Sequence, residues 1–164
     1  MRLVDVSNLE IQNQISGFFT DDNNTPTFAV CDGDVVGASV APTLDGGCLG
    51  FVPPELRLFP KLRELSVEQS DLDWIAPWIA KMPNLEELRF QYNEIAEIPP
   101  YVCKMNKLRV LDLSHNRIKI IPSALFRNPN LEVVFLNSNA IEEIPPEVSD
   151  FKGRIIGLDH NPLH

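Results

Sequence analysis

The sequence predicts an α/β solenoid, in which short coils stack side by side and each adds one strand to a curved parallel sheet. Three consecutive segments, residues 85–107, 108–130 and 131–153, have the same apolar frame with a period of 23 residues. In each segment the fourth and sixth positions are apolar and alternate with polar residues, which is typical of a strand with one buried face. One such coil cannot bury its own apolar face, so neighbouring coils must stack against it.

The other repeated positions indicate how each coil turns and returns. Asn93, Asn116 and Asn139 occupy the ninth position, where the chain leaves the strand, and their amides can pair with backbone groups that the turn leaves without partners. The proline at the fifteenth position ends the strand and starts the return segment. The residues expected to fill the interior are Leu88, Phe90, Leu111, Leu113, Val134 and Leu136 on the strands, and Ile95, Ile98, Ile118, Ile121, Ile141 and Ile144 after them.

The shared frame, L-x-x-L-x-L-x-x-N-x-I-x-x-I-P, resembles the leucine-rich repeat family, with 23-residue repeats. The resemblance implies a parallel sheet on the concave side and irregular or 3₁₀ segments on the convex side. Intracellular adaptors of this family, including the Ras-related plant group and bacterial proteins with 23-residue repeats, have the same I-P repeats. The resemblance therefore implies protein recognition through the concave face, in a scaffold or regulatory role. The alternative is the ligand-binding domain of a larger receptor or multidomain enzyme.

The N-terminal part does not follow the repeat, and we predict a cap over residues 1–38 and repeats over residues 39–164. Ser7 is expected to start a helix that ends near Phe19, because Glu10 completes a capping box with it. Two β-like runs, Thr27–Cys31 and Val35–Val40, flank a turn signal and predict a hairpin. A helix followed by a hairpin would cover the open apolar end of the first coil. The repeats comprise about five full or degenerate coils and a partial last one, in which Ile156 and Leu158 point inward.

The start of the repeats leaves two questions open. The inward residues of the first coil are either Pro42 and Leu44 or Ala41 and Thr43, and the apolar Leu44 favours the first pair. The cysteines, Cys31, Cys48 and Cys103, are expected to be buried free thiols, with a Cys31–Cys48 disulfide as the competing interpretation. The segment also resembles the N-terminal cap of plant-type extracellular leucine-rich repeat proteins, in residues Val30, Cys31, Gly50, Val52 and Pro53.

Composition narrows the possible partners. The 164 residues carry a formal net charge of −9, which disfavours nucleic acid and anionic membrane surfaces. The sequence contains no run of about 18 apolar residues, so it does not predict a membrane span. The N-terminus has no apolar signal-peptide core, so we expect a cytoplasmic protein, or an extracellular one if the chain is part of a receptor ectodomain. We expect a monomer that binds a protein or peptide.

The third, fifth, seventh and eighth positions of each coil should point out from the sheet, where a partner would bind. Equivalent positions in adjacent coils form columns about 5 Å apart. The early coils present acidic residues, whereas the later coils present an apolar area, in which Phe135 is the best candidate anchor. The alternative is that these residues only satisfy strand propensity. The predicted partner-binding residues are Phe135, Val133, Val110, Ile155, Tyr92, His115, Arg89, Asp112, Glu87 and Glu64.

The sequence does not predict an enzyme. His115 and His160 share a column but lie two coils apart, which is too far for one metal ion without other ligands. No glycine-rich phosphate loop follows a strand, and no nucleophile has a suitable histidine nearby in the repeat. We therefore expect no catalytic residues, metal or cofactor. A second column, Arg63, Glu86, Arg109, Glu132 and Arg154, alternates in sign and predicts a structural charge ladder.

Overall fold

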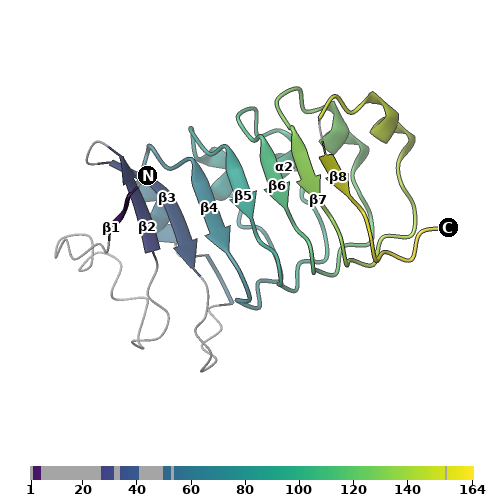
Figure 1. The fold of residues 1–164 in the computed structure, drawn as a ribbon, viewed down its shortest axis with the longest axis horizontal. Helices are drawn as coiled ribbons and strands as arrows, with labels where there is room; N and C mark the ends of the chain where they lie inside the picture. Colours follow the sequence, from purple (N-terminus) through teal and green to yellow (C-terminus); the bar gives the residue numbers. More distant parts are fainter. Residues whose placement is uncertain (1, 5–26, 32–33, 41–49, 53, 154) are drawn as a thin grey trace.

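The computed structural model shows stacked coils whose strands form one eight-stranded sheet (Figure 1). The structure describes residues 2–4, 27–31, 34–40, 50–52, 54–153 and 155–164. Strands β3 to β8 are parallel to one another and follow one another in sequence order, which confirms the predicted solenoid. The strands are β1 Arg2–Val4, β2 Thr27–Cys31, β3 Asp34–Val40, β4 Glu64–Val67, β5 Glu87–Arg89, β6 Val110–Asp112, β7 Val133–Phe135 and β8 Ile155–Gly157.

Each coil returns behind the sheet through a short helical turn (Figure 1). Four of these turns are 3₁₀ helices, as predicted, and the fifth is a single α-helical turn that begins with Pro100 after Pro99. Proline suits this place because its fixed φ matches the start of a helix and its missing N–H is not needed there. The turns are η1 Pro54–Leu58, η2 Ile79–Lys81, α2 Pro100–Cys103, η3 Ser123–Arg127 and η4 Pro146–Asp150.

The core is a row of aligned side chains between the sheet and the return segments. Leu65 pairs in register with Leu88, which pairs with Leu111 and then with Val134, and each of these four is at most 1% exposed. Burial of a side chain of this size contributes roughly 1.5–3 kcal/mol. Ile156 and Leu158 of the last coil pack against the same core, which confirms their predicted orientation.

One interior prediction is wrong. Ile98 and Ile121 are 5% and 3% exposed, whereas Ile144, at the equivalent position of the next coil, is 40% exposed. A solenoid coil is covered only by the coils on either side of it. Ile144 lies on the outermost return segment of the structure, with no further coil stacked on it, so the same sequence position is buried in two coils and open in the third.

The predicted asparagine ladder is confirmed, and Asn116 shows how it works. Its side chain accepts a hydrogen bond from the Ile95 backbone N–H of the previous coil at 3.0 Å. Its Nδ2 donates to the carbonyls of Phe90 and Leu113 at 2.9 and 3.0 Å. One amide therefore connects two strands with the turn that follows them. Asn93, Asn139 and Asn161 make equivalent bonds, so the ladder continues through four coils.

The residue before each ladder position has an unexpected backbone conformation. Tyr92, His115, Ser138 and His160 have φ values of 57, 54, 53 and 59°, and Gln69, at the same position of an earlier coil, has 48°. This left-handed region is sterically disfavoured for residues other than glycine, asparagine and aspartate. It recurs in every coil from β4 onward because the chain must turn sharply there for the next side chain to enter the coil.

The predicted hairpin is confirmed, and its second strand also serves as the first strand of the repeats. β2 and β3 are antiparallel, and β1 adds to the far edge of β2. β3 then pairs with β4 in parallel, with Ala38 opposite Leu65 and buried. β3 is thus the strand beside β4, whereas the residues predicted to point inward in the first coil, Pro42 and Leu44 or Ala41 and Thr43, lie outside the described residues. The hairpin extends the sheet beyond β4, and each of its strands has a hydrogen-bonded neighbour in the sheet.

Three predictions concern residues on the margins of the described structure. The N-terminal helix expected from Ser7 to Phe19 lies outside the described residues. The question of whether Cys31 and Cys48 form a disulfide also falls outside them. β3 crosses the predicted boundary between residues 38 and 39, and that boundary stays a prediction. Cys103 is a buried free thiol, and burial raises its pKa.

The charge ladder is present from Arg63 to Glu132. Glu86 contacts Arg63 at 4.0 Å on one side and Arg109 at 3.8 Å on the other, and two nitrogens of Arg109 donate to Glu132 at 3.1 Å each. The hydrogen bonds that Arg109 donates to Glu132, together with the charge of Glu132, raise the pKa of Arg109. Because Arg109 is exposed, these pairs fix the edge of the sheet with little gain in stability.

Candidate interaction face

The face of the sheet opposite the return segments is open from β4 to β8. We call this surface, formed by the third, fifth, seventh and eighth positions of these coils, the concave face. Its side chains alternate with those of the core, because successive residues of a strand point to opposite sides of the sheet. In β5, β6 and β7 the middle residue is buried and the two outer residues are half-buried.

The predicted apolar residues of the later coils lie side by side. Val110 is in register with Val133, and Val133 is in register with Ile155. Phe135 stands opposite Asp112 on one side and Gly157 on the other. The side chains of Val110, Val133 and Phe135 are half-buried, so together they form a continuous apolar surface instead of isolated exposed residues.

Two aromatic rings mark the end of strands β5 and β6. The ring of Tyr92, which is 49% exposed, stacks on the imidazole of His115, with the ring centroids 4.2 Å apart and the planes 9° from parallel. Both residues have positive φ values, and this backbone conformation sets both side chains at the rim of the concave face. The predicted proximity of Tyr92 and His115 is thus a direct contact.

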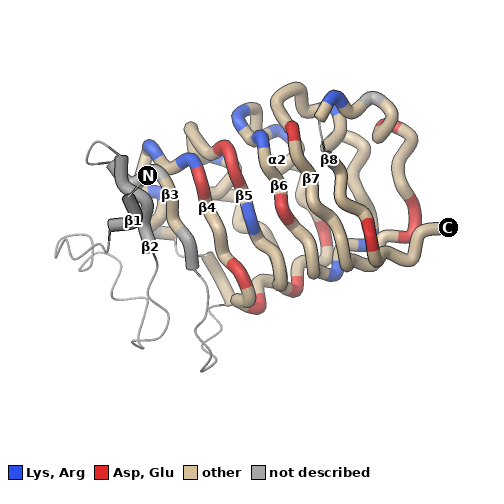
Figure 2. The backbone as a smooth tube through the Cα atoms, in the orientation of Figure 1, with Lys and Arg blue, Asp and Glu red and all other residues tan. Residues whose placement is uncertain are grey.

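The concave face is mainly acidic. From β4 to β8 its charged residues are five carboxylates and one guanidinium, and Figure 2 shows this excess along the strands. Glu64 is in register with Glu87, and Arg89 forms an ion pair with Glu87. The five acidic residues are Glu64, Glu68, Glu87, Asp112 and Asp159. Arg89, the one arginine or lysine in these columns, therefore already has a carboxylate partner.

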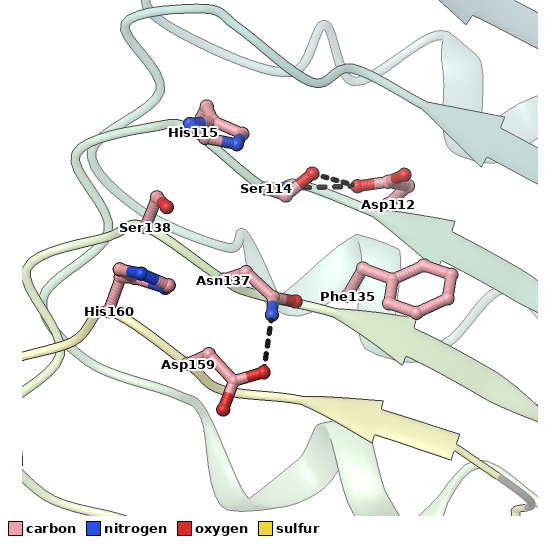
Figure 3. Close-up of a pocket in the computed structure, with 8 residues that line it drawn as sticks. All are labelled: Asp112, Ser114, His115, Phe135, Asn137, Ser138, Asp159 and His160. Carbon is pink, nitrogen blue, oxygen red and sulfur yellow. Dashed lines mark hydrogen bonds between the residues drawn. The ribbon is translucent and has the colours of Figure 1, made fainter.

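A hollow of about 550 Å³ opens on the concave face at the ends of strands β6, β7 and β8 (Figure 3). The lining residues predicted as partner-binding are Asp112, His115 and Phe135. The prediction missed the others, although all of them lie in the same four columns and the periodicity alone places them beside the predicted ones. The full lining consists of Asp112, Ser114, His115, Phe135, Asn137, Ser138, Asp159 and His160. The other predicted residues, Val110, Val133, Ile155, Tyr92, Arg89, Glu87 and Glu64, lie on strands or strand ends outside this hollow.

Hydrogen bonds within the hollow fix two of its carboxylates. Asp112 accepts hydrogen bonds through one oxygen from the backbone and the hydroxyl of Ser114, at 3.0 and 2.6 Å. Asp159 accepts one from Asn137 at 3.2 Å, as Figure 3 shows. Each carboxylate keeps a second oxygen that has no hydrogen-bond partner among the described residues.

The part of the chain that the structure describes has neither of two other kinds of feature, a candidate metal site and a membrane-spanning helix. No group of three or more histidine, cysteine, aspartate or glutamate side chains is arranged to hold a metal ion there. The same residues contain no helix of the length and apolarity that a bilayer crossing requires. The hollow instead combines carboxylates, hydroxyls, an amide and an aromatic ring, which suits recognition of another molecule.

The leucine-rich repeat class of proteins is defined by coils of one strand each, an asparagine ladder and an open parallel sheet. The family model described as "Leucine rich repeat" matches residues 60–118, 83–141 and 106–163, which together make up more than half of the chain. The chain belongs to the leucine-rich repeat family.

Three solved structures have a similar fold. An internalin of Listeria monocytogenes has a TM-score of 0.59 at 20% identity over 68% of this chain and 32% of its own. A leucine-rich repeat protein of Leptospira interrogans has a TM-score of 0.50 at 21% identity over 68% and 41%. The structure of PEPR1–AtPEP1 has a TM-score of 0.60 at 22% identity over 83% and 20%. This chain therefore spans less than half the length of each of these chains. None of the curated proteins compared with it matches significantly.

Proposed function

We propose that this chain is a protein-interaction module that binds a protein or peptide partner through the concave face, in a scaffold or regulatory role. The observation that carries the proposal is the apolar surface of Val110, Val133 and Phe135, which lies beside the hollow on a sheet face that no return segment covers. Leucine-rich repeat proteins use the extended surface of their stacked coils for binding.

The position of Phe135 makes it the expected anchor of the partner. Its neighbours in the sheet half-bury it and restrict its side chain, so the side chain loses less conformational entropy on binding. It also lines the hollow and borders the apolar surface, so a partner that covers both must cover this ring. Aromatic residues in such places commonly dominate the binding free energy.

A random peptide library tests the proposal because the selection requires no named partner. Peptides are selected on the wild-type protein, and the affinity of the best one is measured for wild type, Phe135→Ala and Ile120→Ala. Ile120 is the matched control, because its apolar side chain is 76% exposed and does not belong to the concave columns. Loss of the Phe135 contact, worth roughly 1.5–3 kcal/mol, should weaken binding by about tenfold to a hundredfold.

The Ile120→Ala protein should bind the same peptide within about twofold of wild type. Urea unfolding of the two variants separates a lost contact from a lost fold. The proposal is wrong if no peptide is selected, or if Ile120→Ala loses the affinity and Phe135→Ala keeps it.

A further inference from the structure

The lining of the hollow at the ends of β6, β7 and β8 contains two carboxylates, Asp112 and Asp159, and two imidazoles, but no lysine or arginine. Asp112 lies on β6, whereas Asp159 lies two strands away and two residues further along, beyond the end of β8, so roughly 12 Å separates their backbones. Phe135 and Asn137 lie between them on β7 and just beyond its end (Figure 3). A group placed midway would be roughly 6 Å from the backbone of each aspartate, within reach of both side chains.

Gly157 leaves room for two side chains that line the hollow. A Cβ atom at this position would lie 2.1 Å from Oδ1 of Asn137 and 3.0 Å from Cδ1 of Phe135. Any other residue would therefore displace the Asn137 amide, which donates a hydrogen bond to Asp159. A glycine within a strand often marks the place where another group comes close to the backbone.

We propose that this hollow receives a cationic side chain, that of an arginine or lysine in a basic segment of the partner. This inference rests on the proposed function and adds the chemistry of the ligand. The free oxygen of each aspartate accepts from the N–H groups of the cation, and the ring of Phe135 provides an aromatic surface against which a guanidinium packs. Ser114, Ser138 and the two histidines of the rim supply further polar contacts.

The charge of the surrounding surface agrees with this assignment. The concave face from β4 to β8 carries five carboxylates and one guanidinium, and that guanidinium, Arg89, is paired with Glu87. A basic partner would be attracted along the whole face, whereas an acidic one would be repelled over the same strands. The formal net charge of −9 acts in the same direction at longer range.

Two capped pentapeptides with a central arginine or a central citrulline, flanked by glycines, test the proposal directly. Citrulline has nearly the same shape as arginine but no charge. Binding is followed by the amide NMR shifts of Phe135, Asn137 and Asp159 in the intact chain. The arginine peptide should bind with a Kd of about 1–10 mM, and the citrulline peptide at least about tenfold more weakly.

Two variants refine the test. The double variant Asp112→Asn, Asp159→Asn removes both charges. Its amide oxygens can still accept the hydrogen bonds from Ser114 and Asn137. Arginine binding should fall at least about tenfold. Gly157→Ala should weaken arginine binding by displacing the Asn137 amide that lines the hollow, and its urea midpoint shows whether the fold survives. Glu143→Gln, which removes an exposed carboxylate outside the concave columns, is the control and should change affinity by less than about twofold.

Equal shifts with arginine and citrulline, or no shifts with either, would overturn the inference. Library-selected peptides distinguish this result from a failure of the proposed function. If those peptides bind in a Phe135-dependent way while the arginine peptide does not, the concave face is a binding site for a partner without a cationic anchor. If neither binds, both proposals fail.

Discussion

The ring of Tyr92 lies flat against the imidazole of His115, and both residues hold the backbone in the left-handed region, with φ values of 57 and 54°. The two observations have one cause. Each residue stands immediately before an asparagine of the ladder, so the turn that sends the asparagine side chain inward fixes the backbone of the residue before it. Because the turn recurs every 23 residues, the two side chains project in the same direction from adjacent coils and meet.

The left-handed conformation predicts an unusual response to glycine. Ser138 has a φ of 53°, whereas Ser66 lies within the extended strand β4. Glycine relieves the steric cost of a positive φ, about 1–2 kcal/mol, but in a strand it only adds conformational freedom to the unfolded chain. Ser138→Gly should therefore be more stable than Ser66→Gly by about 1–2 kcal/mol in urea unfolding. Equal losses in the two variants would show that the backbone at Ser138 is not strained.

The asparagine ladder predicts a large loss from a small change. Asn116→Ala removes a side chain that is 9% exposed, leaves the Ile95 N–H without its partner and takes away one of the two amide donors to the Phe90 carbonyl. The free energy of unfolding should fall by about 1–3 kcal/mol. Glu142→Ala, an exposed residue of the next coil, should stay within about 0.5 kcal/mol of wild type. If the two urea midpoints coincide, the ladder does not contribute to stability.

Tyr101 predicts a pH dependence of stability in the alkaline range. Burial, followed by the charge of Glu97, raises its pKa, and its hydroxyl donates a hydrogen bond to the Ile75 carbonyl. A phenol with a raised pKa in the folded state contributes stability that is fully present below the unfolded pKa of about 10 and is lost as the pH rises through the folded pKa. Wild type should exceed Tyr101→Phe by up to about 1 kcal/mol near pH 8.

The difference between wild type and Tyr101→Phe should shrink as the pH rises above about 10, because ionisation removes the proton that Tyr101 donates. Urea unfolding of both proteins at a series of alkaline pH values measures this difference. A constant difference across the series would mean that the hydroxyl of Tyr101 does not titrate in this range or does not stabilise the fold.

The sequence could predict the register of the core because each coil repeats the same local information. The alternation around Leu88 and Leu111 determines which side chains point inward, and the equal spacing then forces these residues to align in the stack. The asparagine ladder follows for the same reason. Ile144 shows the limit of this logic, since its burial depends on a neighbouring coil and not on its own sequence context.

The remaining features depend on structure outside the period. β3 lies beside β4 with Ala38 opposite Leu65, a separation of 27 residues instead of 23, so counting back by the repeat length finds the wrong strand. The left-handed positions carry Gln69, Tyr92 and His115, residue types that give no signal for a positive φ. The sequence analysis also drew nothing from Gly157, and only the structure shows that it leaves room for the side chains of Asn137 and Phe135.

The central claim is that a partner binds on the concave face, and mapping one library-selected peptide onto the wild-type chain tests it most directly. Amide NMR shifts are recorded on the isotope-labelled protein with and without the peptide. The account predicts that the affected residues cluster on β6 and β7 and around the hollow, with Val110, Val133, Phe135 and Asn137 among them. Shifts confined to the return segments η2, α2 and η3, with these four residues unchanged, would contradict it.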